Sequence, residues 1–318
     1  MAGNCGWSLS EDAVLHIFVV YCCFFCIVGI ICNVVALWCV ARCHRTITPV
    51  KVILGAIFSC TLLICLVELP FMAHVFLADL RCDEEVPKTV EDGVIITCVI
   101  INNMELFYIS IMALLRARAV WAPGRGPVKL RTAVALVVGV GLYSLFMLMV
   151  IHVTIWTQDL HIRSDNVLEI AYCVVHYFLP VLLTLVCYLS TIVAVRRNQR
   201  NLPSGQPTAA VDEVTRAMLA VFLSNLVSVL PFSIYAILPL DTDILTTGIM
   251  NMLYYTHLFV DPLVFVCFIR HHRRRVLHGL KLCLGRPPGE EDGSTLESQV
   301  TKSPSALCVP TRGEVKPQ

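Results

Sequence analysis

The stretch AVLHIFVVYCCFFCIVGIICNVVALWCV, residues 13–40, decides how this chain folds. It contains no lysine, arginine, aspartate or glutamate. An α-helix needs about 20 consecutive apolar residues to cross the hydrocarbon core of a bilayer, and this stretch exceeds that length. We therefore expect a membrane-spanning helix here.

More runs of the same kind follow, separated by short polar segments. They occupy residues 52–78, 93–115, 132–157, 170–195, 217–240 and 244–269. Of the 318 residues, 57% are hydrophobic and only 15% are charged, a balance rare in soluble domains. The sequence therefore predicts an all-α protein, built as a seven-transmembrane helix bundle.

Positive charge gathers in every second connection and after the last run, whereas acidic residues gather in the other connections. The cationic segments carry Arg42, Arg45 and Lys51, then Arg116, Arg118, Arg125, Lys129 and Arg131, then Arg196, Arg197, Arg200 and Arg216, and finally Arg270, Arg273, Arg274, Arg275 and Lys281. Because short cytoplasmic loops are enriched in lysine and arginine, this places the N-terminus outside the cell and the tail inside. We expect a multi-pass plasma-membrane protein with a short extracellular segment, 1–12, and no cleavable signal peptide.

The chain beyond the last run changes character. Residues 273–284 form an amphipathic pattern whose apolar members share one helical face: Val276, Leu277, Leu280 and Leu284. This pattern predicts a short helix along the inner leaflet. Cys283 at its end is a candidate palmitoylation site, the alternative being an ordinary reduced cysteine. Residues 285–318 are polar and predict a disordered cytoplasmic tail.

The chain has 16 cysteines, most of them inside apolar runs, where cysteine acts as a small packing residue. Cys5, Cys82 and Cys173 are the ones expected on the oxidising side. One disulfide, between Cys82 and Cys173, is a prediction.

Prolines interrupt four of the runs. They are Pro70, Pro180, Pro231 and Pro262. Each removes a backbone hydrogen bond and favours a kink, which membrane helices tolerate when neighbouring groups satisfy the freed carbonyl. Four such prolines indicate a bundle built to bend.

Several motifs resemble those of rhodopsin-like (class A) G-protein-coupled receptors. Asn33 stands in GIICNVV, Arg116 in LLRARAVWAP, Pro231 in VSVLPF and Asp261 in DPLVF, similar to the family's GN, Asp-Arg-Tyr, CWxP and NPxxY motifs. The resemblance covers residues 13–284 as one seven-helix receptor domain, with the short amphipathic segment as the family's helix 8. Residues 112–123 and DPLVF are weakly similar to prostanoid receptors, so we describe the chain as a divergent orphan of the family.

This resemblance implies coupling to a heterotrimeric G protein. Arg116 would contact the G protein's C-terminal helix, with help from Arg118, Tyr188 and Arg216. Leu115 replaces the acid that normally pairs with the arginine, and losing that pair shifts the two-state balance toward the active form. Asp212 or Glu213 is an alternative partner across the bundle. The plainer interpretation is that Arg116 only snorkels to anchor its helix.

A buried polar cluster is expected from Asn33, Glu105, His257 and Asp261. Residues 257 and 261 are four apart and share a helical face. The second run lacks the family's buried acid, because Thr61 or Leu62 stands at its place, so Glu105 is its candidate replacement. Such a cluster would hold Na⁺, share a proton, or act only as a static hydrogen-bonded group.

The outer half offers polar side chains for a ligand pocket. They are Glu68, Cys98, Asn102, His176, Tyr235 and Tyr255. Cys98 stands where amine receptors carry an aspartate, and Glu68 disfavours a simple carboxylate. The ligand is therefore an unknown small molecule, lipid or peptide, unless these residues only form interhelical hydrogen bonds.

Other functions remain open. Val229 replaces the family's tryptophan, Glu91 its outer cysteine, and Met252 stands where prostanoid receptors carry an arginine. One alternative is a non-signalling protein of the receptor fold that modulates or escorts another membrane protein, and another is an ion or proton channel or transporter. The tail offers phosphorylation and arrestin-binding candidates: Ser294, Thr295, Ser298, Thr301, Ser303 and Ser305. No metal-ligand set, phosphate-binding loop or nucleophile–base pair is evident, so we expect neither an enzyme nor a resident cofactor, nor binding to nucleic acid.

Overall fold

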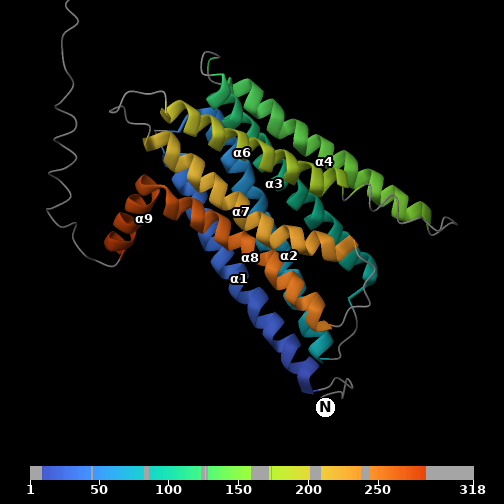
Figure 1. Ribbon diagram of the computed structural model, residues 1–318. Helices are drawn as coiled ribbons and strands as arrows, with labels where there is room; N and C mark the ends of the chain where they lie inside the picture. Colours follow the sequence, from blue (N-terminus) through green and yellow to red (C-terminus); the bar gives the residue numbers. More distant parts are fainter. Residues whose placement is uncertain are drawn as a thin grey trace, which may run out of the picture. The chain divides into compact units, whose positions relative to one another are not determined.

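The computed structural model describes residues 9–43, 46–81, 86–122, 126, 128–158, 172, 174–200, 209–237 and 244–283 (Figure 1). Over these ranges the chain is helical and forms no strand. The helices are α1 (Leu9–Arg42), α2 (Thr48–Arg81), α3 (Lys88–Trp121), α4 (Leu130–Gln158), the π-helical turn η1 (Val174–Phe178), α6 (Leu179–Arg200), α7 (Ala209–Ile237), α8 (Ile244–Phe268) and α9 (Arg270–Cys283). The all-α prediction is confirmed.

Six stretches of the described chain are long and apolar enough to cross a membrane. They are Asp12–Arg42, Thr48–Ala78, Lys88–Trp121, Leu130–Val150, Val174–Ala194 and Leu245–Phe268. The sixth predicted run lies on α7, where the described apolar stretch is shorter, Arg216–Phe232. Helix length and composition thus indicate a multi-pass membrane protein.

Helix boundaries differ from the apolar runs. For example, α3 extends over Lys88–Trp121, well beyond both ends of the predicted 93–115. Hydropathy marks only the part that contacts hydrocarbon, whereas backbone hydrogen bonds continue into the interface until the sequence stops them. Pro87 provides the stop before α3, as its N-cap residue.

The fifth predicted run, 170–195, is not one regular helix. A π-helical turn, Val174–Phe178, precedes α6, and Pro180 is only the second residue of that helix. Because the π-helical turn passes into α6 without a break, Pro180 lies inside the helical stretch Val174–Ala194, as expected. Proline has no N–H to donate, and it lies where the helical geometry changes. Pro70, Pro231 and Pro262 also lie inside α2, α7 and α8.

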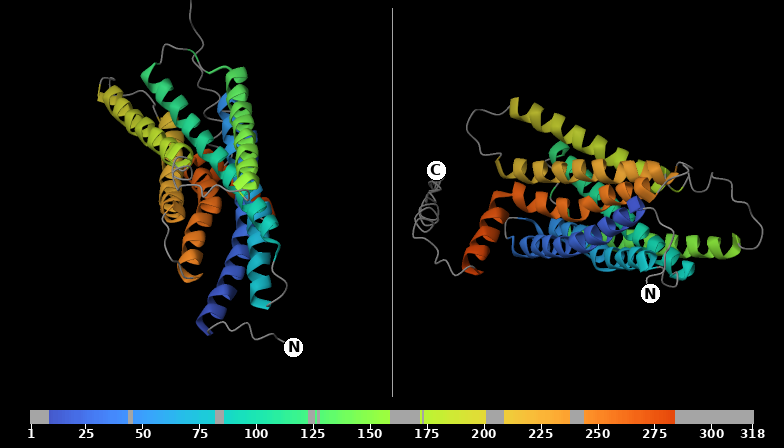
Figure 2. Two further views of the ribbon diagram at one scale, coloured as in Figure 1. Left: turned by 90° about the vertical axis from the view of Figure 1, so that its right-hand side faces the viewer. Right: turned by 90° about the horizontal axis from the view of Figure 1, so that it is seen from below.

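The helices of residues 1–273 pack in a closed order. α1 packs against α2 and α8, α2 against α3 and α4, α3 against α4 and α6, and α7 against α8 and, slightly, α6. Figure 2 shows α7 between α6 and α8 when the bundle is seen from below. The start of α2 and the end of α3, which lie near Arg116, thus belong to one packed unit.

This unit has an apolar core, but it also exposes many apolar side chains and buries several polar ones. The exposed apolar side chains of α1 recur every three or four residues: Ile17, Val20, Phe24, Ile27, Ile31, Val34 and Trp38. The buried polar side chains include Asn33, Thr61, Glu68, Glu105, Asn225, His257 and Asp261. A continuous apolar stripe on the outside marks a surface made for lipid or a partner rather than for water.

Candidate functional site

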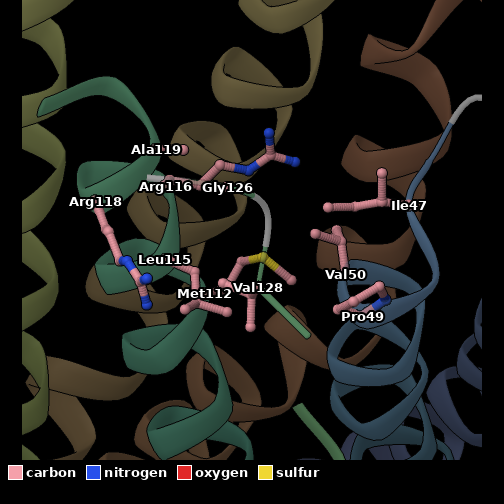
Figure 3. Close-up of a pocket in the computed structure, with 10 residues that line it drawn as sticks. All are labelled: Ile47, Pro49, Val50, Met112, Leu115, Arg116, Arg118, Ala119, Gly126 and Val128. Carbon is pink, nitrogen blue, oxygen red and sulfur yellow. The ribbon is translucent and has the colours of Figure 1, made fainter. Parts of the chain in front are cut away.

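A cavity of about 290 Å³ lies where α3 ends and α2 begins. Its walls are Ile47, Pro49, Val50, Met112, Leu115, Arg116, Arg118, Ala119, Gly126 and Val128. Met112 is fully buried at 0% exposure, whereas Ile47 is 50% exposed, so the cavity has a closed inner part and an open rim. Figure 3 shows the Arg116 guanidinium extending toward Ile47 and Val50, while the Arg118 side chain points away from it.

Arg116 is poorly satisfied in this setting. Its Nε atom is buried and has no hydrogen-bond partner among the residues that the structure describes. The side chain before it is Leu115, and the lining of the cavity contains no acid. The suggested partners Asp212 and Glu213 lie on α7, but their side chains are outside the described ones. A guanidinium with five donors in a low-dielectric setting is stabilised by an anion, so the cavity is chemically suited to bind one.

The other residues expected at this end differ in accessibility. Arg118 and Arg216 are exposed. Tyr188 of α6 is almost fully buried, stacks at 5.5 Å on Phe222 of α7, and lies near enough to Arg116 for an electrostatic interaction. Its hydroxyl has no hydrogen-bond partner. Tyr188 is therefore placed as a second polar group behind Arg116, not on the open surface.

Glu105, His257, Asp261 and Asn225, which we call the Glu105 cluster, meet in the middle of the bundle. His257 Nε2 lies 3.9 Å from Glu105 Oε2, and both side chains are at most 1% exposed. His257 Nδ1 donates to the Tyr254 carbonyl, and Asn225 Nδ2 donates to Asp261 Oδ2. Within the described part of the chain, both Glu105 oxygens, His257 Nε2 and Asp261 Oδ1 have no hydrogen-bond partner. The sequence correctly placed Glu105 beside His257.

Asn33 was expected in that cluster but makes its bonds elsewhere. Its Nδ2 donates to the carbonyls of Gly29 and Leu258, each at 2.8 Å, and its Oδ1 accepts from Thr61 Oγ1 at 2.5 Å. These groups, which we call the Asn33 cluster, join α1, α2 and α8. Thr61 rather than Leu62 faces this centre, because Thr61 is fully buried.

Toward the other end, three of the candidate pocket residues come together around Glu68. Tyr255 donates to Glu68 Oε1 at 3.0 Å, and the Cys98 side chain of α3 also interacts with the Glu68 carboxyl group. Asn102 is buried on α3, and Tyr235 of α7 bonds Thr247 of α8 at 2.7 Å.

His176, in the π-helical turn, belongs to an aromatic group with α4. Its Nε2 bonds the Tyr143 hydroxyl at 2.7 Å, and its Nδ1 bonds the Tyr172 carbonyl at 3.0 Å. The His176 ring stacks on Tyr172 at 4.2 Å, and Asn103 Nδ2 donates to the Tyr172 hydroxyl at 2.6 Å. Both ring nitrogens are satisfied, which supports an interhelical packing role for His176.

Three residues of these contacts were missed from the sequence: Asn225, Tyr143 and Asn103. Asn225, in FLSNLVS, is an amide within an apolar run, a signal for a buried polar partner that was available. Tyr143 and Asn103 gave no such signal, because neither helical periodicity nor spacing shows which faces of α4 and α3 meet the residues around His176.

Other predictions lie outside the described residues. They are the Cys82–Cys173 disulfide, the Cys283 side chain and the phosphorylation candidates of the tail. Among the described side chains, no three His, Cys, Asp or Glu residues are placed to share one metal ion.

Comparison with known proteins adds no assignment: no protein-family model and no curated protein matches this chain. Any function rests on the geometry above.

Proposed function

We propose that this protein is a divergent class A G-protein-coupled receptor that activates a heterotrimeric G protein without an added ligand. In this proposal α7 is a further membrane-spanning helix and completes a seven-helix bundle in the plasma membrane. The N-terminus lies outside, α9 lies on the inner leaflet, and arrestin binds the phosphorylated tail. The positions of lysine and arginine support this orientation.

The observation that carries the proposal is the state of Arg116. It stands at the cationic end of α3, beside a cavity, and its buried Nε has no hydrogen-bond partner among the described residues. Leu115 stands where the receptors that the chain resembles carry the acid that holds the arginine inactive. An arginine without the neighbouring acid is available to a cytosolic partner, and its loss should therefore remove activation.

The test is basal activation of each Gα class in cells, for wild type and Arg116→Ala at matched surface expression. One charge-assisted hydrogen bond contributes about 1.5–3 kcal/mol, so we expect basal activation to fall roughly ten-fold or more. Arg42→Ala removes the same charge from the exposed end of α1 and should leave activation unchanged. Equal signals for wild type and Arg116→Ala would overturn the proposal and favour a non-signalling or escort protein.

A second variant tests the reason for the activity. Leu115→Asp supplies the missing acid next to Arg116, and the new ion pair should lower basal activation several-fold while surface expression stays constant. Unchanged or increased activation in this variant would show that the missing acid does not set the basal level.

A further inference from the structure

The Arg116 cavity has no occupant in the proposed coupling scheme when the G protein is absent. The cavity measures about 290 Å³, near the lower end of the range for small-ligand sites, so a small ligand is a suitable occupant.

The chemistry of the lining specifies that occupant. One guanidinium, that of Arg116, extends into the cavity, and the rest of the lining is apolar apart from Arg118. A carboxylate or phosphate fits the guanidinium through charge-assisted bonds, and phosphate accepts the planar fork particularly well. A free, fully hydrated anion would make no favourable contact with the apolar wall.

The surroundings favour a lipid as the source of the anion. Ile47 on the rim is 50% exposed, and on the neighbouring helices Leu114, Leu130 and Val134 are exposed as well. Lys129 and Arg131 add exposed positive charge beside the cavity wall. A basic pocket between helix ends, flanked by exposed apolar side chains, is a typical site for an anionic headgroup.

We propose that the cavity binds the phosphorylated headgroup of an inner-leaflet phospholipid, which pairs with Arg116 and holds the protein in its non-signalling state. The headgroup supplies the negative charge that Leu115 does not. Binding rests on the cavity alone, and only the assignment to the inner leaflet and the effect on signalling rest on the proposed function.

Lipid retention tests this directly. The full chain is reconstituted in phosphatidylcholine nanodiscs that contain a small fraction of phosphatidylinositol bisphosphate, and the retained lipid is measured by native mass spectrometry. Wild type should retain the phosphorylated lipid about ten-fold more than Arg116→Gln, and Arg116→Lys should recover only part of it, because an ammonium lacks the bidentate fork. Arg42→Gln is the matched control and should behave as wild type.

A second variant guards against misfolding of Arg116→Gln. Val128→Asp places an acid in the non-helical part of the wall, away from α3, and should also reduce retention while the melting temperature stays near that of wild type. Soluble inositol trisphosphate or inorganic phosphate should not displace the lipid at equal concentration. Retention unaffected by either substitution, or full displacement by the soluble anions, would overturn the proposal.

An assay of G-protein activation distinguishes the lipid-site proposal from the receptor proposal. Added phosphatidylinositol bisphosphate should lower basal nucleotide exchange on the G protein several-fold for wild type but not for Val128→Asp. Specific lipid retention without any G-protein activation would support the lipid site and overturn the receptor proposal. G-protein activation without specific lipid retention would support the receptor and overturn the lipid site.

Discussion

The Asn33 cluster and the Glu105 cluster are both buried in the same bundle, yet they differ in how their polar atoms are satisfied. Asn33 uses its amide group and its oxygen in three bonds to three helices. The Glu105 cluster leaves both Glu105 oxygens, His257 Nε2 and Asp261 Oδ1 without hydrogen-bond partners. A satisfied polar group holds helices together, whereas an unsatisfied one raises the free energy of the fold until a proton, water or ion joins it.

His257 shows what the Glu105 cluster lacks. Because the Tyr254 carbonyl can only accept, His257 Nδ1 carries the hydrogen and Nε2 of the neutral ring is an acceptor. Glu105 Oε2, 3.9 Å away, is beyond hydrogen-bonding distance. A single proton shared after a small approach would satisfy both atoms, so this cluster is suited to change state and the Asn33 cluster is not.

The largest stability loss should follow Asn33→Ala. This change removes two interhelical bonds and one bond to the Gly29 carbonyl within α1. A buried bond in a membrane protein contributes about 0.6–1.7 kcal/mol, so we expect a loss of about 2–4 kcal/mol. A denaturant titration in mixed micelles measures it. Thr61→Val removes only one of the bonds and should lose about 1 kcal/mol. Equal losses for the two variants would mean that the bonds to Gly29 and Leu258 contribute nothing.

Gly29→Ala tests how closely the helices approach around the Asn33 cluster. A Cβ atom at position 29 would lie 2.6 Å from Cys65 Sγ, closer than packed atoms allow. Overpacking of this kind destabilises by about 1–3 kcal/mol. Adding Cys65→Ala should recover most of the loss, and the same melting experiment checks both. A double variant no more stable than Gly29→Ala would show that the strain lies elsewhere.

The sequence predicted these two clusters unequally, for physical reasons. The helical face shared by residues 257 and 261, together with the resemblance, indicated Glu105, and the structure places it beside His257. Asn33 was assigned to the wrong cluster because a sequence does not show which of several buried polar groups an amide reaches. Its partners Gly29 and Leu258 are backbone carbonyls, which any residue supplies.

The fold was predictable where one property dominates. Apolar run length predicted the six spans that the described chain contains, because a bilayer requires that length. The π-helical turn before Pro180 was not predictable, because His176 within it bonds Tyr143 of α4, a contact that the sequence does not show. The shape of the Arg116 cavity also follows from tertiary packing, although Leu115 beside Arg116 already indicated an arginine without its usual partner.

Glu105→Gln should change stability in the opposite direction from Asn33→Ala. It replaces a buried carboxyl group without hydrogen bonds by an amide of the same shape whose N–H₂ can face His257 Nε2. We expect a gain of about 1 kcal/mol in the same titration, since removing an uncompensated buried acid is often stabilising. Asp92→Asn, exposed near the start of the same helix, is the matched control and should change nothing. A clear loss of stability would show that Glu105 has partners, such as ordered water, that keep it satisfied.

The smallest effect is expected at His176, the buried histidine of the π-helical turn. His176 has both ring nitrogens bonded, whereas His257 has one, so His176 resembles the Asn33 cluster in kind. Tyr143→Phe removes only the bond to His176 Nε2 and should lower stability by about 0.6 kcal/mol, with Tyr235→Phe as a variant that loses one comparable interhelical bond. If Tyr143→Phe instead matches Asn33→Ala in its effect, the π-helical turn depends on that single bond. Clusters whose polar atoms are hydrogen-bonded would then differ in how much of the stability depends on a single bond, as well as in the number of their bonds.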